Sequence, residues 1–223
     1  TFLAMEYLEG ETLYRRFRRG KQLAAGEVLR LGRQIASALS AAHAKQVIHR
    51  DLKPENILIV PEPEAPGGER VKILDFGLAK LQSSFGSVRT DSNLLMGTPV
   101  YMSPEQCRGG ITMTDRTDVY SLGIILYQML SGNPPFSGTG AGDLIAQHII
   151  EQPKPLHEVA PHVSTEVETL VHKTLAKKPE ERFPSMHDLV EALSRHIVII
   201  FGREIASERK FDVVIAQHRR LLE

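Results

Sequence analysis

Apolar positions along this chain repeat mainly at the three-to-four-residue spacing of helices. Residues 26–45 carry one apolar stripe, which predicts a long helix with a single buried face. Residues 118–130 are apolar on nearly every side, which predicts a buried central helix. Thr165 and Glu168 have the spacing of a capping box at the start of another helix. The helices expected besides the two long ones cover residues 11–19, 143–151, 165–177, 185–196 and 204–222.

Shorter apolar runs are typical of strands, and three are expected, over residues 1–7, 57–60 and 71–74. Residues 61–70 are rich in Pro, Gly and Glu and should form an extended hairpin loop between the last two strands. Residues 77–99 have weak periodicity and many Ser, Thr and Gly residues, which predicts a long loop. Loops of that length in compact domains are usually functional.

Composition and charge narrow the class of protein. The 223 residues are enough for one domain with a sizeable core, and 27 basic residues balance 27 acidic ones. This balance favours neither nucleic acid nor an anionic membrane as a partner. No apolar run is long enough to span a membrane, and the single cysteine, Cys107, fits a reducing compartment. We therefore expect a cytoplasmic protein. The basic run over residues 15–21 is interpreted as a solvated helix face, with docking of an acidic partner or nucleic acid as the alternative.

Two polar runs interrupt the pattern and carry the candidate chemistry. Residues 49–56 read His-Arg-Asp-Leu-Lys-Pro-Glu-Asn, and residues 75–77 read Asp-Phe-Gly directly after an expected strand. Transfer of a phosphoryl group requires an aligned acceptor hydroxyl, a neutralised phosphate charge and a bound metal ion. These two runs offer a carboxylate, an ammonium group and further oxygen ligands in short stretches. Taken singly, each residue is better explained as part of a capped turn or a hairpin.

Together, these runs resemble the catalytic loop and the metal loop of eukaryotic-type serine/threonine protein kinases. The resemblance runs from Thr1 to about Arg195. The short segments between the motifs are similar to those of bacterial members of the family. It implies an α+β, mainly α fold: the large, C-terminal lobe of a kinase with a hinge strand. It also implies ATP and Mg²⁺ as cofactors and a protein with a Ser or Thr acceptor as substrate.

The resemblance assigns roles to the polar residues of both runs. Asp51 would orient the acceptor hydroxyl and Lys53 would balance the charge of the transferred phosphate. Asn56 and Asp75 would hold Mg²⁺, since hard oxygen ligands suit this ion. Thr98, in a Gly-Thr-Pro segment, would contact Asp51 and Lys53 and shape the acceptor pocket; its alternative is a plain turn residue.

Other motif residues are expected to support the site or bind nucleotide. Met5 would be the gatekeeper, Glu6 and Leu8 would bond adenine through their backbones, and Leu58 would form the floor of its pocket; a bare edge strand is the alternative. Structural or regulatory roles fall to His49 (a packed residue and not a base), Arg50, Phe76, Gly77, Glu105 paired with Arg182, and Asp118, which would hold the backbone near His49 and Arg50.

Arg50 precedes the proposed catalytic Asp51, and kinases with Arg at this place are commonly switched on by phosphorylation of the activation loop. The candidate phosphosites are Ser83, Ser84, Ser87, Thr90 and Ser92, of which Thr90 and Ser92 are favoured.

The glycine-rich loop, the strand lysine and the helix glutamate of a kinase have no counterpart in this sequence. We interpret residues 1–196 as a partial kinase domain that lacks the small lobe, and residues 197–223 as a helical extension. The chain is expected to be a fragment of an active kinase; the alternative is a genuine short, non-catalytic interaction module. A small-molecule phosphotransferase of similar fold is a third, less favoured reading.

Overall fold

The computed structural model describes residues 6–20, 22–76, 99–109 and 113–199 of the 223-residue chain. The expectations for Met5, Gly77, Thr90, Ser92 and Thr98, and for residues 204–222, lie outside these ranges. Among the residues that are described, no helix is long and apolar enough to cross a membrane.

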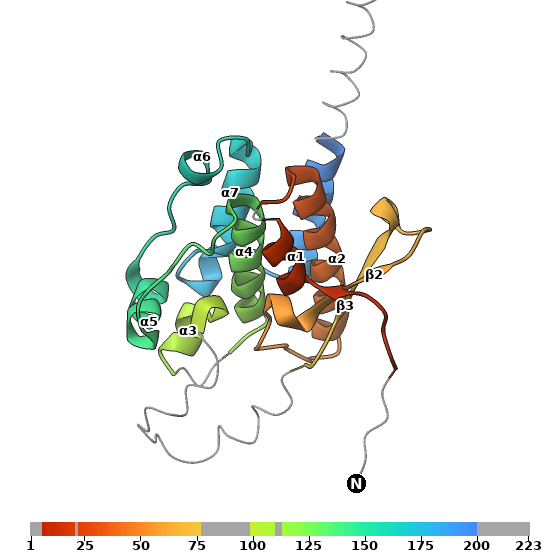
Figure 1. Ribbon diagram of the computed structural model, residues 1–223. Coiled ribbons are helices and arrows are strands. Elements are labelled where there is room, and N and C mark those ends of the chain that lie inside the picture. The colour runs from red at the N-terminus through yellow and green to blue at the C-terminus, as the bar shows by residue number, and fades with distance from the viewer. Residues whose placement is uncertain (1–5, 21, 77–98, 110–112, 200–223) are drawn as a thin grey trace, which may run out of the picture.

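Most of the described chain is helical (Figure 1). The α-helices are α1 (Leu13–Arg19), α2 (Ala25–His43), α3 (Pro104–Cys107), α4 (Arg116–Ser131), α5 (Ala141–Ile150), α6 (Leu156–Val159) and α7 (Thr165–Thr174). Residues 186–199 form a further helix. Short 3₁₀ turns are η1 (Pro54–Asn56), η2 (Pro66–Gly68), η4 (Pro99–Tyr101) and η5 (Pro179–Glu181).

A small antiparallel sheet joins this helical body. Its strands are β1 (Glu11–Thr12), β2 (Ile57–Pro61) and β3 (Glu69–Ile73), in the order β1-β2-β3, with Leu58 opposite both Thr12 and Lys72. The Gln34 side chain on α2 covers the outer edge of β3, because it donates to the Glu69 carbonyl (3.1 Å) and accepts from the Val71 amide (3.0 Å). The β2–β3 hairpin is thereby attached to α2 while its tip projects from the body (Figure 1).

Helix α4 is the centre of the core and packs against α2 and α7. The Leu126 side chain of α4 packs directly on Gly32 of α2, where an added Cβ would lie 2.6 Å from it. Gly123 on α4 is similarly crowded by Thr174 of α7. Residues 118–130 are buried almost throughout, as their apolar pattern predicted.

Several expected boundaries differ from the structure. Residues 11–19 were expected to be one helix, but Glu11–Thr12 pair with β2 as a strand, and the Thr12 side chain then caps α1 at Arg15 (3.3 Å). Glu6 and Tyr7 are not in a strand, because the described sheet gives them no ladder partner.

The capping box expected at Thr165 and Glu168 was wrong by one residue. Ser164 is the N-cap of α7, and its hydroxyl accepts from the Val167 amide (3.4 Å). The Glu168 carboxylate instead bonds the backbone and ring of His157. Helix α7 also ends at Thr174, short of the expected residue 177.

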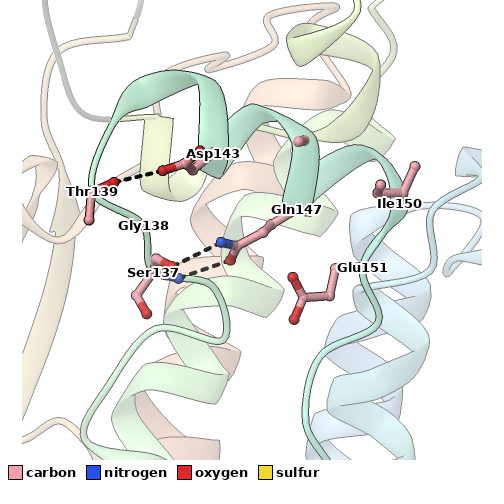
Figure 2. Close-up of a pocket in the computed structure, with 8 residues that line it drawn as sticks. Ser137, Gly138, Thr139, Asp143, Gln147, Ile150 and Glu151 are labelled. Atoms are coloured by element: carbon pink, nitrogen blue, oxygen red, sulfur yellow. Dashed lines mark hydrogen bonds between the residues drawn. The ribbon is translucent and has the colours of Figure 1, made fainter.

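The segment before α5 folds over that helix and leaves a hollow of about 670 Å³ (Figure 2). The Gln147 amide closes it on one side, because it accepts from the Ser137 amide (3.1 Å) and donates to the Ser137 carbonyl (2.9 Å). Thr139 donates to Asp143 (2.8 Å) at the start of the helix. No residue of the 49–56 run lines this hollow.

Candidate active site

Asp118, in the first turn of α4, holds the backbone of the 49–56 loop. Its carboxylate accepts the His49 amide (2.8 Å) on one oxygen and the Arg50 amide (2.9 Å) on the other. The Nε2 atom of His43, the last residue of α2, lies 2.7 Å from the first of these oxygens. A fully buried carboxylate is tolerated when several donors satisfy it, as here. Asp118 therefore fixes where the loop starts.

Arg50 is held in a strained backbone conformation. Its φ is +63°, in the left-handed region, which costs a residue other than Gly on the order of 1–3 kcal/mol. The peptide is clamped from both sides, since Asp118 receives its amide and the Gln106 side chain donates to its carbonyl (2.8 Å). Gln106 is itself fixed by a capping box with Ser103 at the start of α3.

His49 joins the loop to the strand that precedes Asp75. Its Nε2 lies 3.1 Å from the Leu74 carbonyl, and its Nδ1 lies 3.3 Å from the Asp51 amide. A carbonyl accepts a hydrogen bond and a backbone amide donates one, so Nε2 donates to Leu74 and Nδ1 accepts from Asp51. The ring is buried and packs on Phe76, with ring centroids 5.0 Å apart. His49 is thus placed to position its neighbours and has no nitrogen left for acid–base work.

The polar side chains proposed for catalysis lie within a few residues of this junction. The Lys53 ammonium is 3.0 Å from an Asp51 carboxylate oxygen. Asn56, at the end of η1, donates its amide nitrogen to the Asp51 carbonyl (2.9 Å). The backbone carbonyl of Asn56 accepts a hydrogen bond from the Leu74 amide (2.8 Å), which places Asp75 directly beside the 49–56 loop. Asp75 also has a left-handed φ, +51°, a conformation that Asp adopts more readily than most residues.

The oxygen ligands of this junction suit a Mg²⁺ ion. The Asn56 side chain uses its nitrogen in the bond to Asp51, so its oxygen is the atom available to a cation. With the Asp75 carboxylate, it makes a pair of hard oxygen ligands, and Mg²⁺ usually takes one or two protein ligands and fills its shell with water and phosphate oxygens. No cluster of three or more His, Cys, Asp or Glu side chains that could hold a metal occurs among the described residues.

A second polar cluster, formed by Glu105 and Arg182, supports helix α3. The fully buried Arg182 guanidinium binds both Glu105 oxygens, at 2.9 and 2.8 Å, and donates to three backbone carbonyls, those of residues 116, 176 and 177. Burial raises the pKa of the Glu105 carboxyl, but the hydrogen bonds and charge of Arg182 outweigh it, so this pKa is lowered overall. The pair ties α3 to η5 and to the start of α4.

Comparison with known proteins agrees with this geometry. A family model described as the protein kinase domain matches residues 1–193. The chain belongs to the eukaryotic-type serine/threonine protein kinase family.

Relatives of this kinase chain include three bacterial proteins. The serine/threonine-protein kinases pkn3 and Pkn1 of Myxococcus xanthus are 42% and 41% identical over 185 and 201 residues, which cover 81% and 88% of this chain but 33% and 28% of theirs. The serine/threonine-protein kinase PrkC of Bacillus subtilis is 34% identical over 212 residues, or 95% of this chain and 31% of that protein. The kinase chain therefore spans about a third of the length of these relatives.

The expected nucleotide-binding residues of the kinase chain are described only in part. Glu6 is exposed and its carboxylate lies 3.2 Å from the Lys72 ammonium, while Leu8 is half-buried. Leu58 is buried in β2, one residue beyond the first residue of that strand. These positions leave the proposed adenine contacts a prediction.

Two residues of the kinase site were missed by the sequence analysis. His43 contacts the Asp118 carboxylate, and Gln106 holds the strained Arg50 peptide. His43 could have been noticed as a polar residue at the end of an apolar helix. Gln106 gave no such signal, because its partner lies 56 residues away in sequence.

Proposed function

We propose that this kinase chain is the large, acceptor-binding lobe of an enzyme that phosphorylates Ser or Thr in protein substrates. The main support is the junction of the 49–56 loop with the segment that contains Asp75. The Asn56–Leu74 and His49–Leu74 hydrogen bonds make this junction. It gathers Asp51, Lys53, Asn56 and Asp75 at one place, as phosphoryl transfer requires.

In this proposal the chain contributes positioning and charge. Asp51 would accept a hydrogen bond from the acceptor hydroxyl and take its proton as the hydroxyl oxygen bonds to the γ-phosphorus of ATP and the bond from that phosphorus to the departing ADP breaks. Lys53 lies close enough to Asp51 to reach the transferred phosphoryl group and to offset its negative charge. Asn56 and Asp75 would hold Mg²⁺ through their side-chain oxygens, and this ion would supply positive charge opposite the phosphates of ATP.

Arg50 supports a further part of the proposal, activation by phosphorylation. Its Nε is buried and has no hydrogen-bond partner among the described residues. A buried guanidinium nitrogen without an acceptor favours an incoming anion. A phosphate on Thr90 or Ser92, both in the expected activation loop, would supply that anion; mass spectrometry of the whole protein incubated with ATP tests this.

Catalysis also requires a glycine-rich loop and a phosphate-gripping lysine, and the printed sequence contains neither motif. We therefore expect the purified 223-residue chain to show no more than trace transfer of phosphate. A robust, metal-dependent activity of this chain alone would contradict that expectation.

Substitution of Asp51 tests the catalytic proposal in the whole protein that carries this chain. Asp51→Asn keeps the shape of the side chain but removes the base, so phosphorylation should fall about 10²- to 10⁴-fold. Asp143→Asn, on the exposed start of α5, is the matched control and should leave activity unchanged. If Asp51→Asn phosphorylates its substrate normally, the proposal fails. If cellular function survives while phosphorylation is lost, the alternative of a non-catalytic interaction module gains support.

A further inference from the structure

An apolar groove runs between α7 and the helix of residues 186–199. Its floor consists of Leu170, Phe183 and Ala192, and its volume is about 420 Å³. The rim carries charged side chains, of which Lys173 lies over the Phe183 ring, 4.6 Å from its centroid, and Arg195 belongs to the second helix. An apolar floor with a charged rim is the form of a site that receives the apolar face of a helix.

The helix that forms one wall of this groove also exposes apolar surface at its last described turn. Val198 and Ile199 are 72% and 44% exposed, whereas Ile197 packs against the core. Single exposed apolar residues are ordinary, but an adjacent pair next to an apolar groove forms a continuous patch. Such a patch marks a surface that another segment covers.

The sequence that follows supplies a segment of matching chemistry. Residues 200–223 lie outside the described part of the structure, and they contain Gly202 near their start. Beyond it, apolar residues recur with helical spacing at positions 211, 214, 215, 221 and 222. In such a helix, position 213 would lie on the opposite face, and the positions between the apolar ones include Asp212, Arg219 and Arg220.

We propose that residues 204–222 form an amphipathic helix that turns back at Gly202 and docks into this groove of its own chain. Glycine allows the left-handed conformation in which helices commonly end and reverse. The result is an antiparallel helical hairpin, with residues 186–199 as its first arm.

The lengths of the two arms set the register. Seven residues separate Ile199 from Ala192 and seven separate Glu204 from Phe211, and each distance is about 10 Å at the helical rise of 1.5 Å per residue. Phe211 therefore comes level with Ala192, on the groove floor.

The register also brings opposite charges together. Arg195 lies four residues before Ile199, and Glu208 lies four residues after Glu204, so the two side chains come level at the rim. A second copy of the chain could offer the same segment. The short connection favours docking within one chain, because it holds the segment at an effective concentration on the order of millimolar.

Hydrogen exchange of the purified 223-residue chain tests the docking without reference to kinase activity, so it can fail independently of the proposed function. Phe211→Asp should release the segment and speed exchange in α7 and in residues 192–196 about tenfold. Val213→Asp, on the opposite face, is the matched control and should leave exchange unchanged. Equal exchange in both variants and the unchanged chain would overturn the proposal. So would protection that vanishes on dilution through the micromolar range, since it would show docking between copies.

Charge reversal at the rim provides a second test. Arg195→Glu and Glu208→Arg should each speed exchange in α7 several-fold, and the double variant should restore the slower rate. Absence of restoration would overturn the register and the docking that depends on it.

Discussion

Asp118 and Arg182 are both buried charges that hold distant backbone, but they do so in different ways. Arg182 faces an opposite charge, Glu105, and its remaining donors meet backbone carbonyls. Asp118 faces two backbone amides and the ring of His43. The first arrangement joins helices and turns to one another, whereas the second sets the start of the loop that carries Asp51. We infer that Arg182 serves chiefly stability and Asp118 chiefly the geometry of the active site.

Removal of Arg182 should give the largest effect on stability. Arg182→Met removes the charged partner of the Glu105 carboxylate, which keeps only the Thr117 hydroxyl as a side-chain donor, and should lower the free energy of unfolding by about 3–5 kcal/mol. Urea denaturation followed by circular dichroism measures this change. Lys178→Met is the control, because Lys178 is exposed and its pair with Glu181 should contribute less than about 1 kcal/mol. An equal loss of unfolding free energy in the two variants would contradict the structural role assigned to the Glu105–Arg182 pair.

Asp118→Asn should separate activity from stability. The amide can accept one backbone N–H on its oxygen, but its NH₂ group faces the second, so the loop should shift while the fold persists. We expect a loss of about 1–3 kcal/mol in stability. Kinase activity of the whole protein should fall about a hundredfold, since a misplacement near 1 Å has that effect.

Kinetics of the whole protein, with urea denaturation of the same sample, would check this difference. Asp143→Asn is again the surface control. A variant that loses stability but keeps its activity would contradict the contrast between Asp118 and Arg182.

Stability should also depend on pH because of His148, which lies close to Arg182. The Arg182 guanidinium lies over the Tyr120 ring, whose hydroxyl is 3.0 Å from His148 Nδ1. Burial, with the nearby charge of Lys177, lowers the pKa of His148 to about 4. The unfolded chain binds a proton near pH 6.5, so stability should fall as the pH drops from 6.5 toward 4, by about 2–3 kcal/mol.

His148→Asn should flatten this part of the stability profile, measured by urea denaturation between pH 4 and pH 7. His162→Asn changes an exposed histidine and should leave the slope intact. An unchanged slope in His148→Asn would show that other groups cause the acid sensitivity.

The sequence predicted those parts of the kinase fold that depend on local pattern. Helix α2 has a long apolar stripe and α4 is apolar on nearly every side, and the structure places both within two residues of the expected bounds. Strand β1 was missed because two residues become a strand only through pairing with Leu58 and Ile59, far along the chain. Short local signals cannot report such a partner.

In the candidate site, too, the residues of local motifs were predicted and the residues with distant partners were not. The motif residues Asp51, Asn56 and Asp75 were identifiable because the resemblance places each in a contiguous run. Gln106 and His43 were not, since their contacts with Arg50 and Asp118 are made across 56 and 75 residues of sequence and carry no periodic pattern. Of these proposed roles, that of Asp51 is tested by Asp51→Asn.

The smallest expected change in stability comes from the helix cap Ser164. Ser164 caps α7 through the amide of Val167, three residues on, so Ser164→Ala should lower the free energy of unfolding by about 1 kcal/mol. Thr165→Ala is the matched control at the position that the sequence first indicated as the cap, and its cost should be within about 0.5 kcal/mol. Urea denaturation of the two variants would compare them. If Thr165→Ala were the more damaging, the cap would be at Thr165 after all. The Ser164 cap acts on an amide three residues away, whereas Asp118 bonds backbone amides 69 and 68 residues away. A local cap stabilises one helix, but the bonds of Asp118 hold α4 and the loop of the proposed catalytic residues in one geometry.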